Sequence, residues 1–278
     1  MNDHASAETR FAFGDNWRAY LARLDAGRTA EAEKSLQGLL GCERLDGSTF
    51  LDIGSGSGLF SLAARRLGAR VHSFDHDAES VACTAMLKER YAPDDASWTV
   101  ERGSVLDRDY LAGLGTYDTV YAWGVLHHTG AMREAVRKAA ALVRSGGTFA
   151  FALYRKTPSC GAWRLEKRWY ARANPSAQRR ARALYVTLMR LYYRLRGRDF
   201  AAYVSGYVSK RGMDFAHDVH DWLGGYPYQS IAPAAVAEIM TSLGFEHVRS
   251  VILPRSLGVF GSGCDEYVYR RPGPPPPG

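Results

Sequence analysis

The sequence lacks the long apolar segments and paired cysteines that identify membrane proteins and disulfide-rich proteins. No apolar run in its 278 residues reaches the roughly 18–20 residues that a membrane-spanning helix needs. Residues 1–10 are polar and contain no apolar core of a signal peptide. The four cysteines lie far apart without a C-x-x-C pair, so we expect free thiols, a cytoplasmic location and no bound metal.

Two common phosphate-binding motifs are also absent. The dinucleotide pattern G-x-G-x-x-G fails because Leu59 stands where its third glycine would be, and no G-x-x-x-x-G-K-[ST] loop occurs. Residues 49–58 instead join a short apolar run, fit for a buried strand, to glycines at alternate positions, with Asp52 two residues before the first of them. A carboxylate so close to the turn would repel pyrophosphate, so the pattern suits a ligand with a positively charged amino-acid end.

The net charge of +7 hides an uneven distribution. Between Arg155 and Arg211 there are fifteen Lys or Arg and two acidic residues, a local balance of +13, so the rest of the chain carries −6. Any partner attracted by charge should therefore meet this basic segment. The final residues, 272–278, are nearly all Pro and Gly, which predicts a disordered tail.

Between these segments the pattern alternates strand and helix five times. Apolar runs ending at Asp75, Gly103, Trp123 and Tyr154 follow the first strand, with helical patterns between them, including 59–67, 78–91 and 132–143. Such alternation at roughly 25-residue intervals predicts a parallel sheet with helices on both faces. A helix at 233–243 and strands at 246–254 and 264–270 are expected to close the sheet with an antiparallel pair.

Two motifs in this α/β pattern resemble the class I S-adenosylmethionine (SAM) dependent methyltransferases. They are D-x-G-x-G-x-G at 52–58 and W-G-V-L-H-H-T at 123–129. The resemblance covers roughly residues 49–154 and resumes near 232–270. It implies a Rossmann-like, doubly wound, mostly parallel seven-stranded sheet with a terminal antiparallel hairpin strand and a mainly helical insertion.

The resemblance divides the chain into five parts and assigns the cofactor site. The parts are an N-terminal helical cap (1–46), the SAM-binding core (47–154), a basic, mainly helical substrate lid (155–231), the rest of the core (232–271) and the tail. In the cap, the aromatic-led helix with Trp17 either packs on the core or covers the cofactor. The implied cofactor residues are Trp17, Asp52, Gly54, Ser55, Gly56, Gly58, Asp75, His76, Ser104, Val105 and Trp123.

Within that set the expected roles differ. Asp52 and the glycines would hold the methionine end of SAM, together with backbone near Trp123. Asp75, which stands 21 residues after Gly54, would accept hydrogen bonds from both ribose hydroxyls. Backbone groups at Ser104 and Val105 would read the adenine edge.

Four histidines are candidates for the base that deprotonates an acceptor. His127 and His128 lie in the second motif, and His217 and His220 each precede an aspartate that could orient them. A His with a pKa of about 6.5 can take the proton of a hydroxyl acceptor at neutral pH. The alternatives are that one of the first pair only orders its loop, that the second pair only contacts a cap or interface, or that it binds a metal.

The basic insertion allows three interpretations. Its leucines recur at helical spacing between Leu184 and Leu195 among several arginines. This helix either buries its apolar face, touches anionic lipid or a lipid-like substrate, or binds a phosphate-bearing partner such as nucleic acid.

We therefore expect a SAM-dependent O-methyltransferase acting on a small molecule in natural-product or quinone-type metabolism, with a lipid-like or carrier-linked acceptor left open. One alternative is a tRNA methyltransferase that uses the basic segment. It is less favoured, because the fourth strand ends Ala122-Trp123-Gly124-Val125 and lacks the [DNS]-P-P-[YFW] motif of amino-group methylases. Another is a SAM-binding protein without turnover. A homo-oligomer is left open.

Overall fold

The computed structural model describes Trp17 and residues 24–207 and 215–273, without the side chain of His217. The expected aromatic helix near residue 11 and most of the proline-rich tail lie outside these residues. None of the described helices is both long enough and apolar enough to cross a membrane.

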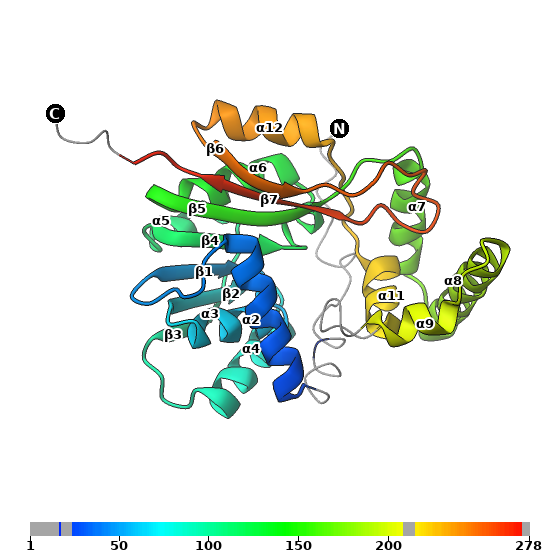
Figure 1. The fold of residues 1–278 in the computed structure, drawn as a ribbon, viewed down its shortest axis with the longest axis horizontal. Helices are drawn as coiled ribbons and strands as arrows, with labels where there is room; N and C mark the ends of the chain where they lie inside the picture. Colours follow the sequence, from blue (N-terminus) through cyan, green and yellow to red (C-terminus); the bar gives the residue numbers. More distant parts are fainter. Residues whose placement is uncertain (1–16, 18–23, 208–214, 274–278) are drawn as a thin grey trace.

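Seven strands form one sheet, as the resemblance implied (Figure 1). In chain order they are β1 (Thr49–Ile53), β2 (Arg70–Asp75), β3 (Trp98–Arg102), β4 (Tyr117–Trp123), β5 (Val143–Tyr154), β6 (Glu246–Val251) and β7 (Cys264–Arg270). Their order across the sheet is β3-β2-β1-β4-β5-β7-β6. The first five are parallel, and β7 runs antiparallel to both β5 and β6. The predicted fold class is confirmed.

Helices cover both faces of the sheet, because the central strands are apolar on both sides. One face packs against α2 (Ala26–Leu40), α3 (Leu59–Arg66) and α4 (Ala78–Tyr91). The other packs against α5 (Arg108–Ala112), α6 (Met132–Ala141) and α12 (Pro233–Ser242). The helix predicted to reach Val143 ends at Ala141, since Val143 already pairs with Tyr117.

The described helices of the insertion (155–231) lie beyond the end of the sheet at which β5 stops (Figure 1). They are α7 (Cys160–Tyr170), α8 (Pro175–Leu195), α9 (Phe200–Ser205) and α11 (Phe215–Gly224). The segment leaves and rejoins the sheet at one point, where Arg155 forms a parallel bridge with Ile231 and the N–H of Ile231 donates to the oxygen of Tyr154 at 3.0 Å. A small core of its own forms around Tyr170, Val219 and Leu223.

The helix α8 turns its leucines outward, so the interpretation with a buried leucine face is wrong. Leu184, Leu188, Leu191 and Leu195 are 61%, 47%, 51% and 77% exposed. The opposite face packs instead, with Met189 buried and Tyr185 and Val186 against the small core. The sequence carries two apolar stripes on this helix, and the bulkier aromatic one meets the rest of the insertion.

Candidate functional site

The glycine turn connects β1 to the N-terminus of α3. The N–H of Gly54 donates to the carbonyl of Phe74 in the neighbouring strand at 2.8 Å, and α3 has no side-chain cap at its N-terminus. Gly54 has a φ of +74°, and a Cβ there would lie 2.4 Å from a methyl carbon of Val125. Only glycine fits this left-handed, closely approached backbone. At the start of α3 the N–H of Leu59 has only a long contact, 3.4 Å, with the hydroxyl of Ser57.

Asp75 reaches across this turn from the end of β2. One carboxylate oxygen accepts the N–H of Gly56 at 3.1 Å, and the other accepts the N–H of Asp77 at 2.9 Å. Burial raises the pKa of Asp75 to about 6, against the effect of these hydrogen bonds. The residue expected to hold the ribose is therefore tied to the turn expected to hold the amino-acid end. His76, the next residue after Asp75, is exposed, and its carbonyl accepts a hydrogen bond from Nε of Arg102 at 3.2 Å.

Asp52 lies beneath the turn within a buried polar chain. Its side chain accepts the hydroxyl of Ser61 on α3 at 2.5 Å, that hydroxyl meets Ser73 at 2.7 Å, and the indole of Trp98 donates to Ser73 at 2.9 Å. Burial raises the pKa of Asp52 to about 7. This series of hydrogen bonds fixes β1, β2, β3 and α3 relative to one another. The observed contacts of Asp52 are therefore structural. Its contact with the methionine end of SAM stays a prediction.

Thr84 and Trp17 contact the glycine turn from neighbouring parts of the structure. Ser55 Oγ contacts the hydroxyl of Thr84 on α4 at 2.9 Å, and the same hydroxyl donates to the carbonyl of Gly56 at 3.2 Å. A Cβ on Gly56 would lie 3.0 Å from Nε1 of Trp17. The indole of Trp17 therefore lies directly against the turn, where the cap interpretation expects it.

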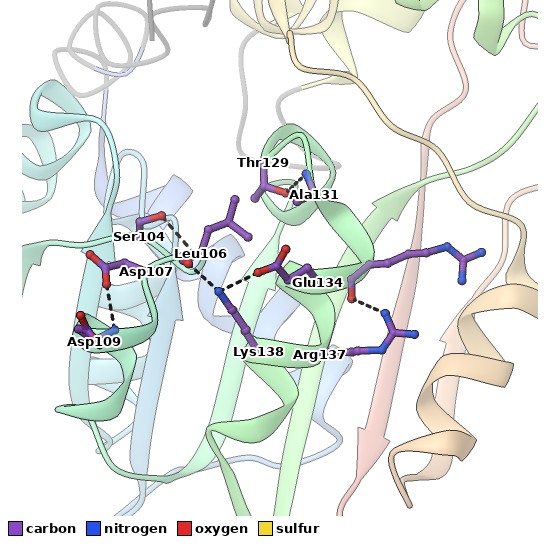
Figure 2. A network of polar contacts seen from close by, with 10 residues as sticks. Ser104, Leu106, Asp107, Asp109, Thr129, Ala131, Glu134, Arg137 and Lys138 are labelled. Atoms are coloured by element: carbon purple, nitrogen blue, oxygen red, sulfur yellow. Dashed lines mark hydrogen bonds and ion pairs between the residues drawn. The ribbon is translucent and has the colours of Figure 1, made fainter. Parts of the chain in front are cut away.

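The loop after β3, expected to face adenine, is fixed to α6. Ser104 Oγ accepts the N–H of Leu106 at 3.2 Å, and Asp107 caps α5. Figure 2 shows Lys138 of α6 donating to the carbonyl of Leu106 at 2.6 Å while it pairs with Glu134 at 2.8 Å. Val105 in the same loop is buried. A lysine from the next layer thus sets the position of backbone that could read a base edge.

The second motif follows β4 and places its two histidines in contact. Trp123 ends the strand and its Nε1 donates to Glu266 at 3.3 Å. His127 and His128 lie in the short helix η2 (Leu126–His128), with ring centroids 4.4 Å apart. Burial lowers the pKa of His127 well below its ordinary value and that of His128 to about 3. Both imidazoles are therefore neutral at pH 7.

Each of the two histidines has a defined neighbour. His127 Nδ1 accepts the N–H of Tyr154, the last residue of β5, at 3.3 Å. Nδ1 of His128 donates to the carbonyl of Pro227 at 2.8 Å. His128 thus connects the second motif to the loop after α11, which suits an ordering role, whereas His127 keeps Nε2 without a hydrogen-bond partner.

The other predicted pair lies inside the insertion. His220 Nδ1 accepts from Nη1 of Arg182 at 2.9 Å and lies 2.8 Å from the hydroxyl of Tyr170. These contacts join α7, α8 and α11, so the observed role of His220 is to connect helices within the insertion. The side chain of His217 is outside the described part of the chain. Among the described residues, no three His, Cys, Asp or Glu side chains are grouped as metal ligands.

Sequence reasoning missed the cluster where the insertion meets β5. Lys167 of α7 is fully buried, and its Nζ lies 3.6 Å from the ring centre of Trp222 on α11. Tyr154 and Tyr228 complete the surroundings, with their ring centres 5.2 Å apart. Nothing local distinguishes Lys167 from its basic neighbours in the sequence, so only the fold reveals this cluster.

Comparison with known proteins identifies the family and the fold. Residues 22–201 match the family model described as a methyltransferase domain. A ubiquinone biosynthesis O-methyltransferase of Methylobacterium sp. (strain 4-46) is 36% identical over 119 residues, which are 42% of this chain and 45% of that protein. The chain thus matches less than half the length of that curated relative.

Two solved structures share the fold. Magnesium protoporphyrin IX methyltransferase from Synechocystis PCC 6803, with bound S-adenosylhomocysteine (SAH), aligns with a TM-score of 0.54 at 17% identity, over 92% of this chain and 93% of that one. The N-methyltransferase NodS from Bradyrhizobium japonicum WM9, also with SAH, aligns with a TM-score of 0.51 at 14% identity, over 94% and 99%. At these identities the likeness concerns the fold alone.

Proposed function

This chain belongs to the methyltransferase-domain family, and we propose that it transfers a methyl group from SAM to a hydroxyl group of a small aromatic acceptor. One observation carries the proposal. The carboxylate of Asp75 and the bare backbone of the glycine turn are joined by a hydrogen bond at the ends of neighbouring parallel strands. Ligands of doubly wound sheets bind at those strand ends.

The residues present fit SAM. A Cβ at Gly54 or Gly56 would meet neighbouring side chains, so only glycine allows the close packing of this turn against Val125 and Trp17. Asp75 holds the ribose hydroxyls, Trp17 covers the turn, and the loop of Ser104 and Val105 meets adenine. SAM supplies an electrophilic methyl group on its sulfonium, and the protein aligns the acceptor oxygen with it, an effect worth several kcal/mol.

The acceptor site lies between the second motif and the insertion. Nδ1 of the neutral His127 accepts the N–H of Tyr154, so its Nε2 carries the ring hydrogen and can donate a hydrogen bond to the acceptor, whereas His128 is held by Pro227. His220 serves the internal order of the insertion. The name of the curated relative supports a phenolic, quinone-type acceptor and therefore O-methylation.

A lipid-like acceptor is supported by the outer face of α8. The four exposed leucines of this helix share one stripe, and α8 contains no acidic residue. Exposed arginines at positions 180, 190 and 194 flank that stripe. An apolar stripe with flanking arginines suits a surface of anionic lipid. A second copy of the chain suits it less, since a symmetric contact would bring the arginines together.

Calorimetry and a methyl-transfer assay test the proposal. We expect one SAM or SAH to bind per chain, and methylation of catechol-type acceptors to be faster when they carry an isoprenoid tail. The absence of SAM binding would refute the proposal. Binding without transfer to any acceptor of this class would favour a SAM-binding protein without turnover.

The basic segment also favours one rival acceptor, RNA. Titration with tRNA at two salt concentrations distinguishes an RNA acceptor from a small-molecule acceptor, since binding through phosphate contacts weakens steeply as the salt concentration rises. Strong, salt-sensitive binding together with methylated tRNA would replace the small acceptor. We place the reaction in the cytoplasm, which is consistent with four cysteines that form no disulfide bond.

A further inference from the structure

Lys167 is a buried cationic residue that has no polar partner within the described structure. Its side chain is 0% exposed, and Nζ forms no hydrogen bond. Buried polar atoms are nearly always hydrogen-bonded, and buried charges are paired. An exception in a native fold indicates a partner that the chain itself does not supply.

Aromatic rings surround this nitrogen in place of polar atoms. Nζ lies 3.6 Å from the ring centre of Trp222, 5.3 Å from that of Tyr228 and 5.9 Å from that of Tyr154. The rings come from α11, from the loop after it and from the end of β5. Ring faces stabilise a cation, but they offer no atom that can accept a proton from it in a normal hydrogen bond.

Two other buried nitrogens beside Tyr154 likewise have no hydrogen-bond partner among the residues that the structure describes. They are Nε2 of His127 and Nε1 of Trp222. The ring of His127 lies 3.8 Å from that of Tyr154, and the ring of Trp222 lies 5.1 Å from it. An amine, an imidazole nitrogen and an indole N–H thus gather around one tyrosine at the strand end that faces the insertion. Apolar walls with a few convergent polar groups are typical of small-molecule sites.

We propose that Lys167 binds the acidic oxygen of a phenolic acceptor and takes up its proton. This inference rests on the proposed function and names its substrate class and a further catalytic residue. The lone pair of the amine forms an N–H bond while the O–H bond of the phenol breaks, which gives an ammonium–phenolate pair. A lone pair of the phenolate then forms the O–CH3 bond as the S–CH3 bond of SAM breaks, and that electron pair stays on sulfur.

The surroundings fit this role. Burial lowers the pKa of Lys167, while Glu166, Asp221 and Cys264 act in the opposite direction. A neutral amine is therefore accessible near neutral pH, and a phenolate would supply the missing counter-charge. The titratable and charged groups around Lys167 are Glu166, Asp221, Cys264, His127, His128, Tyr154 and Tyr228.

A spectroscopic titration with 4-nitrocatechol tests this pair without turnover. The probe absorbs differently as phenol and phenolate, so its ionisation can be followed when bound. We expect the wild-type chain to lower the pH at which the probe ionises by at least one unit. Lys167→Met should abolish this shift and weaken binding at least tenfold. The control Lys156→Met removes an exposed lysine close to Tyr154 and should behave as wild type.

Thermal melts separate this role from a structural one. Methionine fills similar space without an unpaired amine, so Lys167→Met should melt no lower than wild type at pH 7. Should that variant fail to fold, carbon-13 NMR of the wild-type lysines serves instead. One Cε resonance should titrate far below the others and respond to the probe.

The inference is overturned if the wild type leaves the probe unshifted, or if Lys167→Met retains the shift. A lysine Cε that titrates normally and ignores the probe would also overturn it. The titration is run with and without SAH. Failure to bind SAH refutes the proposed function, whereas the probe alone decides the role of Lys167.

Discussion

Replacing Asp75 by asparagine should make the protein more stable at pH 8 and yet weaken its hold on SAM. The carboxylate has a pKa raised by burial to about 6 from an ordinary value of 3.8. A difference of roughly two units corresponds to about 3 kcal/mol between the ionised and neutral forms. Because the folded pKa is the higher one, this stability is present in acid and is lost as the pH rises through 6.

Asparagine stays neutral, so the variant avoids this loss. It cannot accept both the N–H of Gly56 and the N–H of Asp77, and one lost hydrogen bond costs about 1 kcal/mol. The variant should therefore gain about 2 kcal/mol at pH 8 and lose about 0.4 kcal/mol at pH 4, with the two stability curves crossing at about pH 4.5. Urea denaturation across this range measures both effects.

The same change should weaken SAH binding about thirtyfold, since one charged hydrogen bond to the ribose is worth about 2 kcal/mol. Calorimetry at pH 8 measures it, and wild-type affinity should itself fall as the pH drops below 6. The control is Asp77→Asn, because asparagine caps α4 as well as aspartate does. An Asp75→Asn variant that is less stable at pH 8, or that binds SAH as tightly as wild type, would refute the reasoning.

Three further changes test other parts of the site. Gly54→Ala places a Cβ 2.4 Å from Val125 at a φ of +74°, and it should lower the free energy of unfolding by about 2 kcal/mol or more; an unchanged urea midpoint would contradict this. Lys138→Met frees the loop after β3 and should weaken SAH binding about fivefold; calorimetry checks this, and an unchanged affinity would remove the loop from the site. Leu188→Glu should reduce sedimentation with phosphatidylglycerol-containing vesicles about tenfold, whereas Leu257→Glu, at a site 68% exposed elsewhere, should not; equal losses would refute lipid contact by α8.

Local patterns predicted the parts of this structure that local interactions decide. The glycine turn follows from residues adjacent in the chain, and β4 and α4 begin and end as expected. The place of Asp75 also followed, because a strand–helix–strand unit of fixed length brings its carboxyl ends to one edge. Its hydrogen bond to Gly56 places Asp75 beside the glycine turn, while its contact with ribose stays a prediction.

Contacts between distant segments decided what the sequence could not show. Lys167 and Arg168 are neighbours in one basic run, yet one is buried and the other exposed, because only the first faces Trp222. Periodicity revealed two apolar stripes on α8 but not which one the aromatic core would select. The histidine pairs were likewise equal candidates until the fold placed His127 beside Tyr154 and His220 beside Arg182.

The single bridge at Arg155 and Ile231 bears on how such an enzyme acquires new substrates. The entire helical segment departs and returns through that narrow neck, beside a strand already held by β4 and β7. Recombination or lengthening beyond the neck can spare the donor half of the enzyme as long as Pro227 and Gln229 remain to hold His128 and the start of α6. Exchanging the helices of this segment while keeping those two residues is thus a practical route to altered acceptor choice.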